Sequence, residues 1–232
     1  MMKESLIKLT ILLCSIFTVL PYANAQGGIA LGSTRVIYPA GSKQVSLSVN
    51  NSSRHERYLI NSWVSDQHDK KSKDFIVTPP LFVSEPSQEN TLRIMYIGHA
   101  LPTERESLFY LNVKAIPSVN RESVENKNVL QLAILSRIKL FVRPPTLAFP
   151  AGDAAKQLRF IRRGATLKIR NPSPYYLTLV NLKSGSLALP SRMVAPESTI
   201  TLPMPASSTG DITYQTINDY GALTASMKGV MQ

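Results

Sequence analysis

Cysteine is almost absent from this chain, and its absence excludes several kinds of chemistry. Cys14 is the only cysteine among 232 residues, and it lies in an apolar segment near the N-terminus. The rest of the chain therefore cannot form a disulfide, use a thiolate nucleophile or bind a metal through sulfur. A protein of this composition has to be stabilised by a hydrophobic core.

Signatures of catalysis are also lacking. The three histidines, His55, His68 and His99, are scattered without the spacing of a metal site. The sequence contains no ordered Ser-His-Asp set, paired-carboxylate motif or phosphate-binding glycine loop. We therefore expect a protein that is not an enzyme and that uses neither a cofactor nor a metal ion.

The N-terminus, residues 1–25, has the pattern of a secretory signal. Lys3 and Lys8 accompany an apolar run at 9–20, and the small-x-small sequence at 23–25 suits signal peptidase. The run is shorter than the ~20 residues of a membrane-spanning helix, and no later segment is long and apolar enough to span a bilayer. The pattern predicts export and cleavage after Ala25; a membrane anchor is the alternative.

Positive charge exceeds negative charge. The chain has 26 Lys and Arg residues against 15 Asp and Glu residues, a net charge of +11. A basic surface attracts nucleic acid, anionic lipid or acidic proteins. Export argues against nucleic acid, and a charged surface that serves only solubility explains the excess equally well.

Beyond the signal, the sequence predicts an all-β protein. Short runs rich in Val, Ile, Leu and Tyr are separated by turn residues. The first seven runs are 29–38, 44–49, 58–64, 75–78, 91–97, 107–116 and 129–142; five more are 166–169, 175–181, 199–202, 211–217 and 222–227. Seven strands at this spacing are typical of an immunoglobulin-like β-sandwich, with Trp63 as a candidate core residue.

Prolines separate the two sets of strands. Pro144-Pro145 ends the seventh run because proline cannot continue a β-ladder, and residues 153–163 are polar and turn-like. We therefore expect two immunoglobulin-like β-sandwich domains, residues 26–146 and 147–232.

The seventh run is unusually long. Residues 129–143 would extend for roughly 50 Å at ~3.3 Å per residue, and Leu130, Leu132 and Ile134 alternate with Gln131 and Ala133. A long strand with an apolar stripe invites pairing with another chain. The alternative is that the three apolar residues fill the core of their own domain.

Several segments resemble one protein family. They are SRIKLFVRP (136–144), RESLFYLNV (105–113), TRVIY (34–38), TPP (78–80) and INDYG (217–221). These motifs are similar to those of PapD-like periplasmic pilus assembly chaperones, and they occur in the expected order over the chain beyond the signal. The short segment 118–128 resembles the short-loop branch of that family.

The resemblance implies both a fold and a function. Two immunoglobulin-like domains would form an L or boomerang, and Leu130, Leu132 and Ile134 would complete the sheet of a pilin subunit that lacks a strand. Arg35 and Lys139 would bind the C-terminal carboxylate of the subunit. Interdomain ion pairs would join three further residues, Glu106, Arg143 and Asp219.

The resemblance also implies partners and a location. The chaperone would act in the periplasm without ATP and deliver its subunits to an outer-membrane usher, and it would not span a membrane. Whether the free protein self-associates through its exposed strand stays open. The second class of function is a secreted carbohydrate-binding or adhesin-type β-sandwich, for which Tyr175, Tyr176 and Tyr220 are the candidate exposed aromatic residues.

Overall fold

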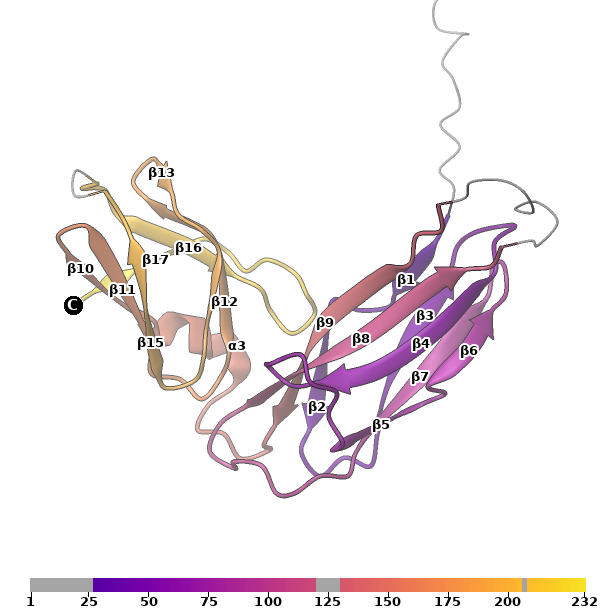
Figure 1. Cartoon of the computed structure of the whole chain (residues 1–232). Helices are drawn as coiled ribbons and strands as arrows, with labels where there is room; N and C mark the ends of the chain where they lie inside the picture. Colours follow the sequence, from indigo (N-terminus) through magenta and orange to yellow (C-terminus); the bar gives the residue numbers. More distant parts are fainter. Residues whose placement is uncertain (1–26, 120–129, 206–207) are drawn as a thin grey trace, which may run out of the picture.

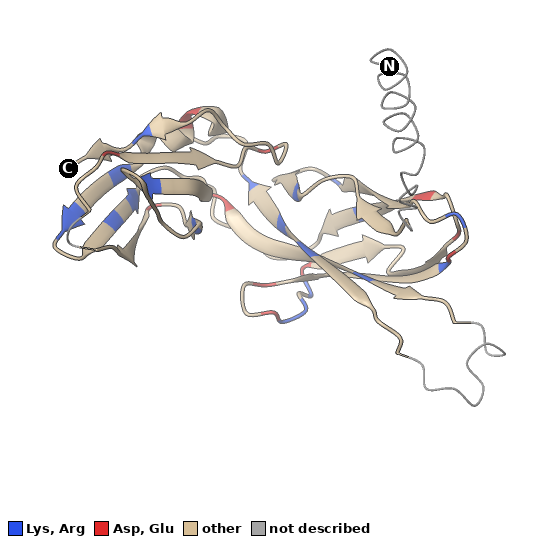
Figure 2. Ribbon diagram, turned by 90° about the horizontal axis from the view of Figure 1, so that it is seen from above, with Lys and Arg blue, Asp and Glu red and all other residues tan. Residues whose placement is uncertain are grey.

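The computed structural model describes residues 27–119, 130–205 and 208–232. The expected signal at 1–25, its cleavage site and Val129 lie outside the described residues. No helix within the described part of the chain is long and apolar enough to cross a bilayer. Lys and Arg residues occur on both halves of the molecule (Figure 2).

The described chain forms two β-sandwich domains that meet at an angle (Figure 1). In the N-terminal domain one sheet has the order β1-β3-β7-β5 and the other β2-β9-β8-β4-β6. Its strands are β1 (Ile29–Leu31), β2 (Arg35–Pro39), β3 (Val45–Asn51), β4 (Tyr58–Ser65), β5 (Phe75–Thr78), β6 (Leu81–Ser84), β7 (Glu89–Tyr96), β8 (Ser107–Pro117) and β9 (Ile134–Arg143).

The first predicted strand is divided between the two sheets. β1 pairs with β3 in one sheet, and β2 pairs in parallel with β9 in the other. The backbone N–H of Gly32 donates to the carbonyl of Ser48 at 2.9 Å, and a Cβ on Gly32 would lie 2.1 Å from the Ser48 hydroxyl. The prediction of one continuous strand at 29–38 was wrong because the chain crosses between sheets at this close contact.

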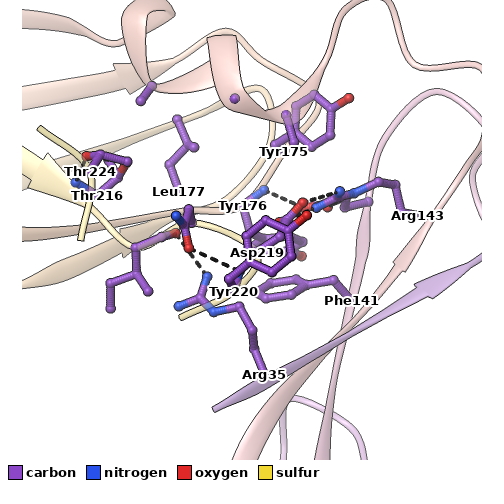
Figure 3. Close-up of a pocket in the computed structure, with 16 residues that line it drawn as sticks. Arg35, Phe141, Arg143, Tyr175, Tyr176, Leu177, Thr216, Asp219, Tyr220 and Thr224 are labelled. Carbon is purple, nitrogen blue, oxygen red and sulfur yellow. Dashed lines mark hydrogen bonds and ion pairs between the residues drawn. The ribbon is translucent and has the colours of Figure 1, made fainter. Parts of the chain in front are cut away.

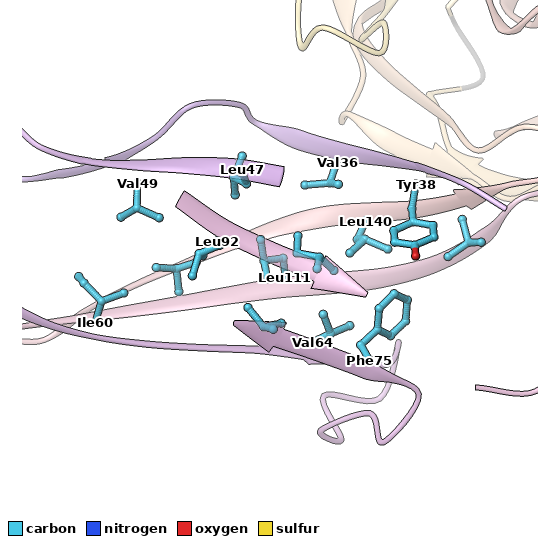
Figure 4. Packing of buried hydrophobic residues seen from close by; sticks show 14 of the residues in the cluster. Val36, Tyr38, Leu47, Val49, Ile60, Val64, Phe75, Leu92, Leu111 and Leu140 are labelled. Carbon is cyan, nitrogen blue, oxygen red and sulfur yellow. The ribbon is translucent and has the colours of Figure 1, made fainter. Parts of the chain in front are cut away.

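Alternate residues of the strands fill the space between the two sheets (Figure 4). Val49, Ile60, Leu92, Leu111 and Leu140 are all completely buried there. The prediction that Trp63 belongs to this core was wrong. Ile60 and Val64 on β4 face the core, so the intervening Trp63 points to the other face of the sheet, where it is half-buried.

Two further strand predictions need correction in this domain. β6 was not expected, because its run is short and proline residues lie on both sides of it; it pairs with β4 from Tyr58 to Asn61. β9 begins at Ile134, so residues 130–133 are not in a strand as the prediction at 129–142 had them. Ile134 pairs with Ala115 of β8, and β8 itself ends two residues later, at Pro117. Residues before Ile134 therefore have almost no β8 residues left to pair with.

The C-terminal domain has its own core, which includes Phe160, Leu167, Ile169, Leu179 and Tyr214. One sheet has the order β15-β11-β10-β18 and the other β13-β12-β16-β17, with β14 beside β12. The elements are α3 (Ala151–Ala154), the 3-10 turn η1 (Ala155–Gln157), β10 (Arg159–Arg163), β11 (Thr166–Asn171), β12 (Leu177–Ser184), β13 (Leu187–Ala188), β14 (Arg192–Val194), β15 (Ser198–Pro203), β16 (Ile212–Thr216), β17 (Met227–Lys228) and β18 (Val230–Met231).

Two predictions in this domain were wrong for local reasons. Residues 159–163 form β10 although they look polar, because the inward Arg162 is hydrogen-bonded to the Ser184 hydroxyl and the Gly210 carbonyl. The predicted strand at 222–227 is mostly irregular: Leu223 makes an isolated bridge with Ile217, and β17 begins only at Met227. The Asn218 side chain accepts hydrogen bonds from the backbone N–H groups of Tyr220 and Ala222, which stabilises a turn just before this segment.

The alternation on β9 makes a stability prediction. Leu140→Ala should lower the free energy of unfolding by ~2–5 kcal/mol, because it leaves a cavity in a fully buried site. Leu135→Ala on the same strand, at a side chain that is 51% exposed, should change it by less than ~0.5 kcal/mol. Urea unfolding measures both, and equal losses would contradict this assignment of the two faces.

Candidate functional site

The pairing of β2 with β9 brings together Arg35 and Lys139, the two residues expected to bind a carboxylate, which we call the anchor residues. In this parallel pair Arg35 lies opposite Lys139. On β9, Ile138, Leu140 and Val142 pack into the domain core, so Lys139 and Phe141 face outward, toward the C-terminal domain. The β8–β9 register runs from Ile134 to Val142 without a bulge, so the anchor and Ile134 lie on opposite faces of the strand.

Arg35 is a largely buried cation without an acidic partner among the described residues. Its side chain donates to the carbonyl of Ile217 in the other domain at 3.1 Å, and its guanidinium carbon lies 5.9 Å from the centre of the Phe141 ring. Its Nε is buried and has no hydrogen-bond partner. Burial lowers the pKa of Arg35, while the negative charges of Asp219 and Glu106 oppose that shift.

Lys139 is the second such cation. Its Nζ donates to the Thr178 hydroxyl of the C-terminal domain at 3.0 Å, and no ion pair of Lys139 occurs in the described part of the chain. Burial first, and then the nearby charge of Arg35, lower the pKa of Lys139. Two neighbouring cations without an acidic partner form a site that favours an anion, above all a carboxylate, which matches the planar guanidinium fork.

Arg143 joins the two domains through the residues expected to form ion pairs (Figure 3). Its Nε contacts Glu106 Oε1 at 2.7 Å, and its two terminal nitrogens contact the Asp219 carboxylate at 2.6 and 2.7 Å. The other oxygen of Glu106 accepts the backbone N–H of Tyr176 at 2.8 Å. Glu106, Arg143 and Asp219 therefore form one network that spans the domain junction.

Burial and ion pairing shift the pKa values of the groups in this network. Burial raises the pKa of Glu106, and the charge of Arg143 and the Tyr176 N–H partly offset that increase. For Arg143, burial acts to lower the pKa, but hydrogen bonds and charges from Asp219 and Glu106 outweigh it and raise the pKa. Because Asp219 and Glu106 are both paired with Arg143, neither neutralises Arg35 or Lys139 directly.

A cavity of about 270 Å³ lies at this junction (Figure 3). It is lined by residues of both domains, among them Arg35 and Phe141 on one side and Leu177 and Ile217 on the other. Tyr176 packs against Phe141 with ring centres 5.7 Å apart. Tyr220 at the rim is 92% exposed. The Arg35 guanidinium thus faces an open space between the domains.

The second feature of the site is the edge of β9. β8 pairs with β9 along its length, whereas β2 pairs with it only from Lys139 onward. Among the described strands none pairs with the other edge at 134–138. Next to this edge Leu130, Leu132 and Ile134 are 81%, 66% and 59% exposed. The alternative that these three residues fill their own domain's core does not hold.

Sequence reasoning missed several contacts of this site. Thr178 and Ile217 belong to the other domain, and no sequence pattern places them beside Lys139 and Arg35. Arg137 lies over the Tyr110 ring at 3.6 Å and pairs with Asp69 at 2.5 Å. The alternation of β9 carried a signal for Arg137, since it shares the outward face with Lys139.

Comparison with known proteins identifies the family. Residues 28–148 match "Pili and flagellar-assembly chaperone, PapD N-terminal domain", and residues 153–227 match "Pili assembly chaperone PapD, C-terminal domain". The chain is 50% identical to the probable fimbrial chaperone SfmC of Escherichia coli K12, over 94% of this chain and 95% of that protein. It is 51% identical to the chaperone protein FimC of the same strain, over 90% and 87%.

Solved structures agree with these matches. The periplasmic chaperone SfaE is 48% identical, with a TM-score of 0.77 over 88% of this chain and all of that one. A structure of the Salmonella enterica SafA pilin in complex with the SafB chaperone also matches, at 34% identity and a TM-score of 0.80. The match covers 90% of this chain and 98% of that one. The alternative of a carbohydrate-binding β-sandwich is not favoured by any of these matches. Two immunoglobulin-like domains, the cationic cleft between them and these similarities together show that this chain belongs to the PapD-like family of pilus assembly chaperones.

Proposed function

We propose that this chaperone captures pilin subunits by adding residues 130–138 as a strand to the subunit's incomplete sheet. The observation that carries the proposal is an open strand edge beside three exposed apolar side chains. Main-chain hydrogen bonds along the edge supply generic pairing, and Leu130, Leu132 and Ile134 fill pockets of the subunit. The solved complex of the relative SafB with the SafA pilin supports this partner class.

The magnitude of the apolar contribution is sufficient for capture. Burying one such side chain contributes ~1.5–3 kcal/mol, so three contribute several kcal/mol before the cost of association is subtracted. Residues 130–133, which lie outside regular secondary structure, would become strand only when a guest strand supplies their hydrogen-bond partners.

Arg35 and Lys139 fix the register in this proposal. A shift of one residue along a strand turns every side chain to the opposite face, so generic pairing alone does not hold the apolar stripe in the subunit's groove. A subunit carboxylate bound by the two cations sets where the guest chain ends. The Glu106–Arg143–Asp219 network holds the two domains at the angle that keeps Arg35 and Lys139 together.

Location, release and further partners complete the proposal. Residues 1–25 direct export, and cleavage after Ala25 leaves domains 26–146 and 147–232 in the periplasm; the mass of the exported protein tests this directly.

Release to an outer-membrane usher needs no ATP, because a better-fitting strand replaces β9. The protein performs no chemistry of its own. Free molecules would associate weakly through the same exposed stripe, which subunit binding then covers.

Replacing an anchor residue should strongly weaken capture. Arg35→Ala and Lys139→Ala should each weaken binding of a purified subunit by at least ~30-fold, since loss of one partner of a buried charge pair costs ~2–5 kcal/mol. Lys114→Ala, which removes an exposed lysine from β8, is the matched control. Binding is measured by titration calorimetry and folding by circular dichroism.

A blocked subunit makes this test specific for the carboxylate. Amidation of the subunit's C-terminus should weaken binding to the wild-type chaperone but cause little further loss in Lys139→Ala. Full additivity of the two changes, or capture by either anchor variant at the wild-type level, would show that the carboxylate binds elsewhere.

Charge on the apolar stripe should also weaken capture. Leu132→Glu should reduce subunit affinity by ~10-fold or more, because it places an unpaired charge in an apolar pocket. Gln131→Glu, at the neighbouring position of opposite parity, should have a much smaller effect. The unfolding midpoint of Leu132→Glu in urea should stay near that of wild type, and severe destabilisation would mean that Leu132 belongs to the chaperone's own core.

The interdomain network predicts a change in rigidity. Asp219→Ala should broaden the distribution of distances between spin labels placed one on each domain, because it removes the only bidentate contact of Arg143 across the junction in the described structure. Asp211→Ala, which breaks an exposed ion pair with Lys228 inside the C-terminal domain, is the control. Equal distributions in wild type and Asp219→Ala would refute an angle-setting role.

A further inference from the structure

A basic surface on the C-terminal domain has no role in subunit capture as described above. The domain, residues 147–232, carries nine Lys and Arg residues but only four Asp and Glu residues. Each acidic residue is ion-paired: Asp153 with Lys156, Glu197 with Arg105, Asp211 with Lys228 and Asp219 with Arg143. Among the described residues, the other positive charges of the domain have no acidic partner.

Four of these cations lie on one face of one sheet. In the β10–β11 pair Arg159 lies opposite Arg170, Ile161 opposite Lys168 and Arg163 opposite Thr166. Phe160, Leu167 and Ile169, at the alternate positions, are buried in the core, so the cations point outward. We name the outward face formed by Arg159, Arg163, Lys168 and Arg170 the basic face. Figure 2 shows Lys and Arg positions as blue bands on adjacent strands of this domain.

The rest of this face is neutral. The outward residues of the neighbouring β15 are Thr199, Thr201 and Pro203, and β18 places Val230, 49% exposed, beside Arg159. Like charges directly opposite each other destabilise a sheet, so we expect the Arg159–Arg170 pair to lower the stability of this sheet. No ion pair involves any of the four cations within the described residues.

The basic face points away from the cleft. Thr178, which contacts Lys139, lies on β12, and Ile217, which contacts Arg35, directly follows β16. Both strands belong to the other sheet of the domain. The β15-β11-β10-β18 sheet lies on the far side, remote from the N-terminal domain (Figure 1). A partner on the basic face therefore leaves both the anchor and the edge of β9 accessible.

We propose that the basic face docks the chaperone reversibly onto an anionic phospholipid bilayer. The exported protein works between two membranes, and a basic surface is drawn to negatively charged headgroups without needing a shaped pocket. Protein interfaces instead concentrate aromatic anchors at a desolvated centre, and none of the outward residues of β10, β11 and β15 is aromatic. Ile161 and Val230 add a small apolar contribution among the cations.

Vesicle flotation tests this docking without any subunit, so its result is independent of the proposed capture mechanism. The wild-type protein should float with vesicles of phosphatidylcholine mixed with an equal amount of phosphatidylglycerol, and not with pure phosphatidylcholine. Binding should disappear at about 1 M salt, where the screening length falls to about 3 Å.

Charge-removing variants locate the contact. Arg163→Gln/Lys168→Gln/Arg170→Gln should weaken binding roughly 100-fold, at about fivefold for each cation near an anionic surface. Lys43→Gln/Lys183→Gln/Arg192→Gln removes the same charge from other exposed positions and should weaken it far less. If the first triple variant unfolds, Arg163→Gln/Arg170→Gln, at two exposed positions, replaces it, with an expected loss of roughly 25-fold.

Three results would overturn the proposal. The first is that the wild-type protein does not bind anionic vesicles at low salt. This includes the case in which the basic face binds an acidic protein instead. The second is equal binding by wild type and the variants of the basic face. The third is an equal loss in the control variant, which would assign the attraction to net charge alone.

Discussion

Among the described strands, β9 has hydrogen-bonding partners on both edges only from Lys139 onward, and the function of the molecule depends on this constraint. Backbone N–H and C=O groups require partners, and an unpaired edge invites a foreign strand. β2 begins at Arg35 because the chain crosses between sheets at Gly32–Thr34, so the edge of β9 at 134–138 stays open among the described strands. The same crossing places Arg35 where the open edge ends, beside Lys139. The edge open to a guest strand thus ends where the two cations lie.

The three cations near the end of the open edge have two different roles. Arg143 takes both nearby carboxylates, Glu106 within its own domain and Asp219 across the junction. The hydrogen bonds that Arg35 and Lys139 make within the described structure instead go to neutral oxygens of the C-terminal domain, the Ile217 carbonyl and the Thr178 hydroxyl. One cation therefore joins the domains while two remain available to an anion. If Arg143 lost its contacts, the freed carboxylates of Asp219 and Glu106 could compete for Arg35, whose charge they already favour.

Much of this arrangement could be predicted from the sequence, and the rest depends on contacts between distant segments. The all-β character and the two β-sandwich domains follow from alternation and from family motifs, whereas the position of Arg35 opposite Lys139 comes from the pairing of β2 with β9. Trp63 was misplaced because alternation defines two faces but not which of them is the core. Ile134 and Ile138 share one face of β9, yet one is exposed and the other packs inside, which depends on how far the opposite sheet extends. The polar run at 159–163 concealed β10 because Arg162 points inward to partners 22 and 48 residues away.

Amide hydrogen exchange along residues 130–138, compared between the free and the subunit-bound chaperone, tests the central claim most directly. In the free protein, amides that point away from β8 should exchange fast. On binding a subunit, alternate amides of this segment should become strongly protected, because a guest strand accepts their hydrogen bonds, while the buried amides around Leu111 should change little. Unchanged exchange at 130–138 in a stable complex would contradict the account, because the subunit would then be held by some other surface.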